Sequence, residues 1–382
     1  MHQWNRKVGA LGAIALAAAL VTACGGGGSD TETQVEITSV KVMGDSLADV
    51  GTFGGVIATV QGGVMYPQRV AESFGVTKPC NYYVATGATT FVPNPAAGCT
   101  NYAIGGGRIN NFSNPASPLS VIQQLKDASA TTNFGARELV LIDGGGNDAA
   151  DLVGAYLRAA SDSGATYGGL LKTVLDATVV DTQMATGAAG LANLGGLYMT
   201  ALANQFSDAI DANVVQKGAQ YVAVLNMPPI THTPRFQTVL NAIAAANGAN
   251  GVAARAQAEA LFKGWISAYN SRLAARFAGN SKVAVVDFYT SFEDNIANPS
   301  QYSLTNVTTP ACPATGVGSD GLPTYTFATC TAAALSAAPP TGVTDPNWWR
   351  SYAFSDGFHP TPYAHQLVSQ LIARSLASKG WL

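Results

Sequence analysis

Four short runs along the chain are almost continuously apolar and rich in β-branched residues. Such runs are expected for strands of a parallel sheet that is covered by helices on both faces. They occupy Ile37–Met43, Glu138–Ile142, Tyr221–Leu225 and Lys282–Phe288. The pattern therefore predicts an open and mostly parallel sheet.

Between these runs the apolar residues recur at helical spacing. The predicted helices cover Tyr66–Phe74, Gly154–Ala177, Leu194–Val215, Gly251–Phe277 and Pro362–Ser378. In the last of them we expect Thr361 to be the N-cap and Pro362 the first helical residue. Residues 76–100 and 296–347 are rich in Pro, Thr, Ala and Gly, and predict long surface loops. Because strands and helices alternate without an internal linker, we expect a single elaborated α/β domain.

The start of the chain has the pattern of an export signal. Arg6 and Lys7 are followed by a small apolar run, Val8–Val21, which is too short to cross a bilayer comfortably. The junction "LVTACGGGG" resembles the lipobox of bacterial lipoproteins, which implies that Cys24 is lipidated after cleavage. The alternative is an ordinary secretory cleavage in which Cys24 is incidental. We expect a lipoprotein signal peptide, a glycine-rich tether and a folded domain at residues 1–23, 24–34 and 35–382.

This lipobox resemblance also carries an expected location. An aspartate after the lipidated cysteine would retain a lipoprotein at the inner membrane, and this chain has Gly25 there. We therefore expect an exported protein that is lipid-anchored at the outer membrane, on its periplasmic or cell-surface side. Membrane contact is expected only through the anchor at Cys24.

The composition argues against nucleic-acid binding and against disorder. Charged residues make up only 11% of the chain, apolar residues make up 47%, and 41 residues are glycine. The formal charge of −3 becomes −5 when Arg6 and Lys7 leave with the signal peptide, and no basic stripe is present. These values favour a large packed domain with many turns.

Four cysteines remain after Cys24, and an even count in an exported protein predicts disulfides. They are Cys80, Cys99, Cys312 and Cys330, for which three pairings are possible. Pairing of sequence neighbours would close the two predicted surface loops. A zinc site is the alternative, but the CxxC or CxH spacing that it requires is missing.

One serine follows the first predicted strand directly, in the stretch "VKVMGDSLAD". In open α/β sheets the functional site lies beyond the carboxyl ends of the strands, and Ser46 is at such an end. A plain turn hydroxyl is the alternative. To act as a nucleophile, Ser46 needs a base, an acid that orients the base, and donors for an oxyanion.

The base is predicted from the segment "SDGFHPT" before the last helix. Asp356 precedes His359 by three residues across a glycine, so its carboxylate can fold back onto the imidazole and fix the tautomer. A solvated aspartate and a capping histidine are the alternative. His232, in "NMPPITHTP", is a second candidate base, but no acidic residue is near it in sequence. His365 is expected to pack or to face solvent.

Two glycine-rich segments are candidates for the oxyanion donors. In "NYAIGGGRI", the absence of side chains at Gly105, Gly106 and Gly107 would let a backbone N–H approach a substrate carbonyl. In "IDGGGNDAAD", the side-chain amide of Asn147 is a second donor. Each segment alone would equally suit a tight turn.

The order of these motifs resembles a known superfamily. They are GDS at 44–46, N-Y-A-x-G-G at 101–106, G-x-N-D at 145–148 and D-x-x-H at 356–359. This order is similar to that of the SGNH hydrolases, the GDSL-type lipases and esterases, over residues 37–380. A central G-x-S-x-G motif is missing, which counts against the α/β-hydrolase fold. The resemblance implies a three-layer α/β/α sandwich of SGNH or flavodoxin-like type.

The resemblance also implies the role of each residue. Ser46 would be the nucleophile, His359 the base and Asp356 the acid. The oxyanion hole would comprise the N–H of Ser46, the N–H of Gly106 (with Gly105 as the alternative) and the amide of Asn147. The implied activity is hydrolysis of carboxylic esters through an acyl-enzyme, with no metal and no cofactor. We expect a monomer that acts on an ester with an apolar acyl part.

The substrate and a second function class stay open at this stage. Aromatic residues near the motifs suit an acyl chain, a polyester or an aryl group, although core packing is the favoured explanation for each one taken alone: Phe53, Phe91, Phe112, Trp348, Trp349, Phe354 and Phe358. The alternative function is a lipoprotein that binds lipid or polymer on a hydrolase fold with little turnover. The complete set of catalytic motifs argues against that alternative.

Overall fold

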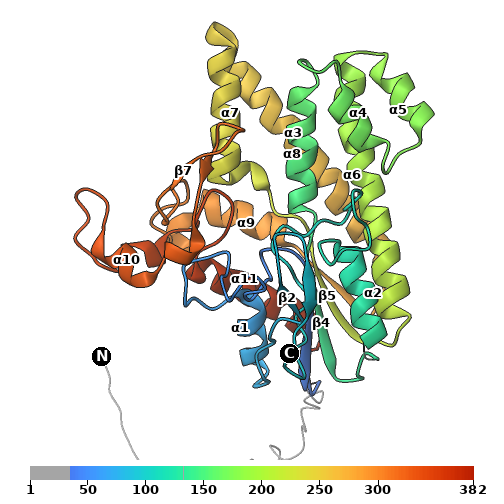
Figure 1. Cartoon of the computed structure of the whole chain (residues 1–382), viewed down its shortest axis with the longest axis vertical. Helices are drawn as coiled ribbons and strands as arrows, with labels where there is room; N and C mark the ends of the chain where they lie inside the picture. Colours follow the sequence, from blue (N-terminus) through green and yellow to red (C-terminus); the bar gives the residue numbers. More distant parts are fainter. Residues whose placement is uncertain (1–34, 132) are drawn as a thin grey trace, which may run out of the picture. The chain divides into compact units, whose positions relative to one another are not determined.

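The computed structural model, which describes residues 35–131 and 133–382, has a parallel four-stranded sheet at its centre (Figure 1). The strands lie in the order β1-β4-β5-β6, and every pair of neighbours is parallel. Their bounds are Ser39–Met43, Glu138–Ile142, Tyr221–Leu225 and Val283–Val286. All four predicted strands are confirmed, with the first and the last shorter than predicted.

The two faces of this sheet are buried against different helices. In β4, Val140 and Ile142 belong to one hydrophobic cluster, whereas Leu139 and Leu141 belong to another. This alternation follows because successive side chains of a strand point to opposite faces. The first cluster includes residues of α2 (Val121–Thr131), α6 (Ala188–Ile210) and α8 (Gly251–Arg276), and the second includes residues of α1 (Tyr66–Ser73) and α11 (Pro362–Ser378). The predicted three-layer α/β/α sandwich is therefore confirmed.

The glycine-rich segment that follows Asn101 runs beside β1, on the side opposite β4. The N–H of Val42 donates to the carbonyl of Thr100 at 3.0 Å, and the N–H of Tyr102 donates to the carbonyl of Val42 at 2.8 Å. The segment thus runs parallel to β1. As a consequence, the chain after Tyr102, the chain after β1 and the chain after β4 leave the sheet at the same edge.

The predicted helices agree in part with the structure. The helix at Pro362–Ser378 has the predicted bounds, and the hydroxyl of Thr361 caps it by accepting the N–H of Ala364. The single helix predicted over Gly154–Ala177 is wrong. Two helices occupy this region, α3 (Gly146–Arg158) and α4 (Ala165–Leu171), because Ser163 and Gly164 have positive φ and turn the chain between them.

The remaining elements are short or lie at the periphery. Helix α6 continues into a π-helical turn at Asp211–Val215. Further helices are α5 (Ala177–Met184), α7 (Pro234–Ala246), α9 (Phe288–Ala297) and α10 (Ala332–Ala337), with short 3₁₀ turns at Ile230–His232, Gly248–Asn250, Pro299–Tyr302, Phe327–Thr329 and Trp348–Ser351. Two small antiparallel hairpins pair β2 (Tyr83–Ala85) with β3 (Phe91–Pro93), and β7 (Gly316–Val317) with β8 (Pro323–Thr324).

Disulfides close the two predicted surface loops. Cys80 is bonded to Cys99 and Cys312 to Cys330, so the pairing is between sequence neighbours. Each bond encloses one of the two hairpins. Closing loops of this length stabilises a fold by roughly 3 kcal/mol each, chiefly by restricting the unfolded chain.

The predictions for the N-terminus fall outside the described residues. This applies to the signal peptide at 1–23, to Cys24 and to the tether at 24–34. Within the described part of the chain, every helix is too short or too polar to cross a membrane.

Candidate active site

Buried polar side chains form hydrogen bonds with the turn that contains Ser46. The N–H of Gly44 donates to the side chain of Gln124 at 2.8 Å, and the N–H of Asp45 donates to Asp143 Oδ1 at 2.9 Å. A β-carbon at Gly44 would lie 2.0 Å from the same carboxylate oxygen, so this position requires glycine. The serine therefore follows β1 in a fixed turn at the carboxyl edge of the sheet.

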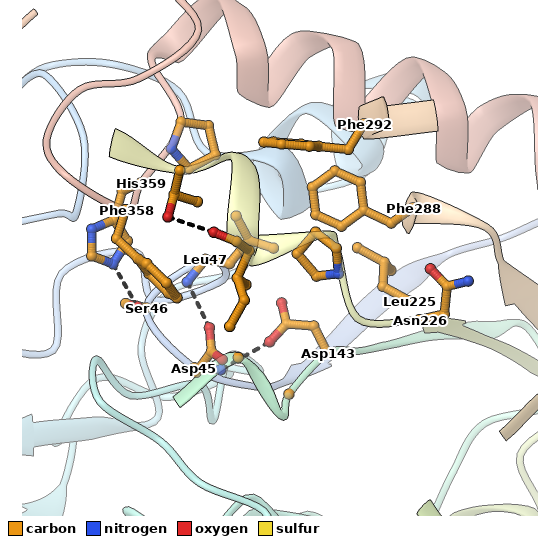
Figure 2. Close-up of a pocket in the computed structure, with 16 residues that line it drawn as sticks. Asp45, Ser46, Leu47, Asp143, Leu225, Asn226, Phe288, Phe292, Phe358 and His359 are labelled. Atoms are coloured by element: carbon orange, nitrogen blue, oxygen red, sulfur yellow. Dashed lines mark hydrogen bonds between the residues drawn. The ribbon is translucent and has the colours of Figure 1, made fainter. Parts of the chain in front are cut away.

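His359 and Asp356 meet Ser46 at this turn, as Figure 2 shows for the histidine. The Nε2 atom of His359 lies 2.7 Å from Ser46 Oγ, and Nδ1 lies 3.0 Å from each carboxylate oxygen of Asp356. The N–H groups of Phe358 and His359 also donate to Asp356 Oδ1, at 2.8 and 2.6 Å. The three side chains thus form a continuous hydrogen-bonded series from the hydroxyl to the carboxylate.

The electrostatics of the pair suit a general base and its orienting acid. Burial alone would lower the pKa of His359, but the charge and hydrogen bond of Asp356 outweigh it, with a smaller contribution from Asp45, and the pKa rises above its ordinary value. Burial would raise the pKa of Asp356, but His359 and the backbone donors lower it on balance. Asp356 is therefore ionised at neutral pH and stabilises a proton on the ring.

The segment that carries both residues is tied to the fold on either side of them. The N–H of Ser355 donates to the carbonyl of His359 at 2.7 Å, which closes the loop on itself. The carbonyl of Pro360 accepts the hydroxyls of Thr59 and Ser355 at 2.8 and 2.9 Å. Because Thr361 then caps α11, the imidazole is placed by a loop that is fixed at both ends.

The backbone N–H groups predicted for the oxyanion hole differ in their hydrogen bonds. Within residues 35–131 and 133–382, the N–H groups of Ser46 and Gly106 donate no hydrogen bond. The N–H of Gly105 donates to Asp49 at 2.8 Å, which excludes it as the alternative donor in this state. Gly106 has a φ of +82°, a conformation that favours glycine.

Asn147 lies in the first turn of α3 and is connected to the same glycine-rich loop. Its amide Nδ2 donates to the carbonyl of Gly107 at 2.9 Å, which leaves its second amide hydrogen for a ligand. The neighbouring Asp148 accepts the N–H groups of Ile109 and Asn110 at 2.9 and 2.8 Å. The loop and the start of α3 are therefore one connected unit.

The other two histidines are used elsewhere. His232 Nε2 lies 3.2 Å from both Glu293 and Lys263, in an ion-pair group of α8 and α9. Its acidic partner is distant in sequence, which is why the sequence does not reveal it. His365 is fully buried and its ring stacks against Tyr66. Burial lowers the pKa of His365 to about 3, so this ring is neutral and packs in the core.

The aromatic residues named from the sequence divide into three groups. Trp348, Trp349 and Phe354 are buried in small hydrophobic clusters and contribute to packing. Phe358 contacts the ring of His359 edge-on, and Phe53 packs against Phe91 next to the glycine-rich loop. Phe112 is 53% exposed. The sequence missed Phe327, whose ring also meets that of His359, with centroids 5.5 Å apart.

The comparison with known families agrees with this geometry. The model of the GDSL-like Lipase/Acylhydrolase family matches residues 40–372. The chain belongs to this family. It is therefore an esterase or lipase, and the resemblance to GDSL-type enzymes is confirmed. A similar solved structure is the lipase Lip_vut3 from a goat rumen metagenome, with 13% identity over 88% of this chain and 97% of the other, and a TM-score of 0.40. No curated protein matches the sequence.

Several buried groups of this GDSL-like enzyme were not predicted from the sequence. Asp143 accepts the hydroxyl of Tyr66 at 2.7 Å as well as the N–H of Asp45. Burial and the nearby charge of Asp45 raise the pKa of Asp143 well above its ordinary value. One sequence signal could have identified Asp143. It directly follows an apolar strand, and the carboxyl ends of the strands form the edge of the sheet at which the site lies.

Replacing Asn147 by alanine is expected to lower kcat for an ester by about 10²–10³-fold, the usual effect of removing one oxyanion donor. KM should change little, because the amide is needed chiefly when the carbonyl oxygen becomes an anion. Steady-state kinetics with p-nitrophenyl acetate measure both parameters. A loss of less than threefold in kcat would show that Asn147 has no such role.

The pH dependence of this enzyme follows from His359. If His359 is the base, as the sequence predicts, its ring must be neutral to accept the serine proton, and kcat/KM should rise with pH through the pKa of His359 in the free enzyme. Because that pKa is raised, the midpoint should lie above the ordinary value of about 6.5. Initial rates between about pH 5 and about pH 9, followed by titration of the released acid, test this. A midpoint below the ordinary value would contradict the assigned partnership with Asp356.

Proposed function

We propose that this esterase cleaves carboxylic esters through an acyl-enzyme intermediate on Ser46. The observation that carries the proposal is the continuous series from Ser46 Oγ through His359 to Asp356, with distances of 2.7 and 3.0 Å. Serine hydroxyls are weak nucleophiles, and an adjacent base that is itself oriented by a carboxylate activates them. The two free N–H groups beside the serine support the same proposal.

In the first half of the reaction, Ser46 Oγ forms a bond to the ester carbonyl carbon while its proton moves to His359 Nε2. The carbonyl electron pair becomes an oxyanion, which accepts hydrogen bonds from the N–H groups of Ser46 and Gly106 and from the amide of Asn147. The carbon–oxygen bond to the alcohol then breaks, and His359 returns its proton to the leaving alkoxide. The acyl group remains on the serine.

In the second half a water molecule takes the place of the alcohol. His359 accepts a proton from this water, whose oxygen attacks the acyl carbon and forms a second oxyanion. When the bond to Ser46 breaks, the serine oxygen takes the proton back and the carboxylic acid leaves. Asp356 stays ionised throughout and stabilises the protonated ring in both halves.

Hydrolysis of p-nitrophenyl acetate tests this proposal most simply. The purified protein should release p-nitrophenol in an initial burst of about one equivalent, because p-nitrophenolate is a good leaving group and formation of the acyl-enzyme should be faster than its hydrolysis. Turnover without any covalent intermediate, shown by rapid-quench mass analysis, would contradict the acyl-enzyme. The absence of turnover on simple esters would instead favour a lipid- or polymer-binding protein.

We also propose that the enzyme is exported and held at the outer membrane by a lipid on Cys24. The lipobox-like sequence and the glycine-rich segment after it support this proposal. Such an anchor would leave the folded domain free to meet ester substrates near the membrane. Labelling of cells with a radioactive fatty acid should mark the wild type and not a Cys24→Ser variant. Equal labelling of the two proteins would contradict this.

A further inference from the structure

A small cavity opens beside the nucleophile and ends in a wall of aromatic residues. Its volume is about 60 Å³, and its lining includes Ser46 and His359 at one side and Phe288 and Phe292 at the other. Figure 2 shows these two pairs at opposite sides of the view, with Leu47 between them. The cavity therefore reaches from the reacting hydroxyl into the body of the domain.

The wall of this cavity is mainly apolar and closed at its far end. Leu225, at the end of β5, and Phe288, at the start of α9, are only 1% and 3% exposed. These two side chains close that part of the wall, and the ring of Phe292, which is partly buried, packs against that of Phe288. Leu47 and Phe358, which flank the two catalytic residues in sequence, line the part next to the reacting hydroxyl.

Two carboxyl groups also line the cavity, but both already accept hydrogen bonds from other residues of the fold. Asp143 accepts the N–H of Asp45 and the hydroxyl of Tyr66, and Asp45 Oδ1 accepts the N–H of Leu47. Both carboxyls therefore have hydrogen-bond partners within the fold and need none from a ligand. The cavity thus presents a surface that suits an uncharged aliphatic group better than a charged one.

The order of bond breaking indicates which part of an ester enters a closed cavity. The alcohol must leave the site before water can attack, so its side of the reacting carbon has to open to solvent. The acyl group stays bound to Ser46 through both halves of the reaction. We propose that this cavity holds the acyl chain of the substrate and restricts the enzyme to short aliphatic acyl groups, an inference that rests on the proposed function.

The volume sets the acceptable chain length. At about 60 Å³ the cavity has less than half the volume of the dry cavity of about 150 Å³ that accepts benzene, so we assign it to a group of roughly two to four carbon atoms. Acetyl, propanoyl and butanoyl groups therefore fit, whereas octanoyl and benzoyl groups do not.

A second, larger cavity is the alternative binding site for a longer acyl chain. It has a volume of about 860 Å³ and is lined by α3, α4, α7 and the β7–β8 hairpin, with Leu157, Phe236 and Val239 among its apolar residues. Its lining does not include Ser46 or His359. Activity that increases with chain length would assign the acyl group to this cleft and overturn the proposal.

The test compares kcat/KM for p-nitrophenyl acetate, butanoate and octanoate in the wild type and in two variants. Phe292→Ala opens the far end of the cavity. Tyr289→Ala removes an aromatic ring from the same helix, and Tyr289 does not line the cavity. Thermal unfolding is recorded for each protein, and Phe292→Leu replaces Phe292→Ala if the alanine variant does not fold.

We expect the wild-type value to fall at least about tenfold from butanoate to octanoate, since one badly placed methylene already costs about tenfold or more. Phe292→Ala should raise the ratio of octanoate to acetate activity at least about tenfold, and Tyr289→Ala should leave this ratio unchanged. A wild type that prefers octanoate, or a ratio that neither Phe292 variant alters, would overturn the proposal. Those results would leave the acyl-enzyme intact, whereas ester hydrolysis that survives Ser46→Ala would instead reject the proposed function.

Discussion

Replacing Ser46 by alanine is expected to lower kcat/KM for p-nitrophenyl acetate by at least about 10⁴-fold, because the residue proposed to form the acyl-enzyme is lost. His359→Ala should cause a loss of similar size, since the serine hydroxyl then has no base at 2.7 Å. Combining the two substitutions should add little, because residues that act as one unit are not additive. Initial rates on the three purified variants measure all of these effects.

The matched control for the histidine is His232→Ala. His232 contacts Glu293 and Lys263 and not Ser46, so this variant should keep its activity within about threefold of wild type. All variants should keep their secondary structure, because Ser46 is half-buried and its removal creates little space. If Ser46→Ala retained more than a tenth of the wild-type rate, the assignment of the nucleophile would be wrong.

Asp356→Asn is expected to lower kcat by about 10⁴-fold while the fold stays intact. The reason is local, since Asp356 Oδ1 accepts the backbone N–H groups of Phe358 and His359. An asparagine would place its oxygen there, and its amide would then donate to His359 Nδ1. The ring would be forced into the tautomer with hydrogen on Nε2, which cannot accept the serine proton.

Asp181→Asn provides the control for this substitution. Asp181 is an exposed carboxylate that pairs with Lys172 at 2.6 Å, so its exchange should alter activity by less than twofold. The pH profile gives a second readout for Asp356→Asn. Without the negative charge, the pKa of His359 should fall, and the residual activity should extend to lower pH. A variant with wild-type kcat would show that the carboxylate does not orient the base.

Local sequence signals were sufficient for much of the fold, whereas the roles predicted for Ser46, Asp356 and His359 came from the resemblance of the ordered motifs to a known family. The four strands are apolar runs, and α11 begins at a Thr-Pro pair whose capping role can be recognised from the sequence alone. Asp356 and His359 are three residues apart, so their contact needs only one loop. The same Thr-Pro signal begins α7 at Thr233, although no helix was predicted there.

Other features depend on residues that are far apart in sequence. Asp143 supports the serine turn across 98 residues, and Gln124 does so across 80. Asp148 fixes the glycine-rich loop across 38 and 39 residues. These contacts depend on which strands are neighbours in the sheet, and a local sequence pattern does not show that order. Propensity also failed at Ser163 and Gly164, where a positive φ interrupts an otherwise helical pattern.

The prediction of the oxyanion donors depended partly on the sequence and partly on the structure. The family resemblance assigned Gly106 and Asn147, with Gly105 left open as an alternative. The structure distinguishes the two glycines, because the N–H of Gly105 is bonded to Asp49 and that of Gly106 has no partner in the described part of the chain. The choice depends on the direction of one peptide group, which composition and spacing do not encode.

The proposed role of Ser46 as the nucleophile is tested most directly by finding which serine a serine-reactive reagent modifies. The protein is incubated with an aryl phosphonate, which reacts only with a serine that a neighbouring base activates. Intact-mass measurement and peptide mapping then locate the adduct. We expect one equivalent of phosphonate on Ser46 and none on the His359→Ala variant. An active enzyme that carries the adduct on another serine, or that carries none, would contradict this role of Ser46.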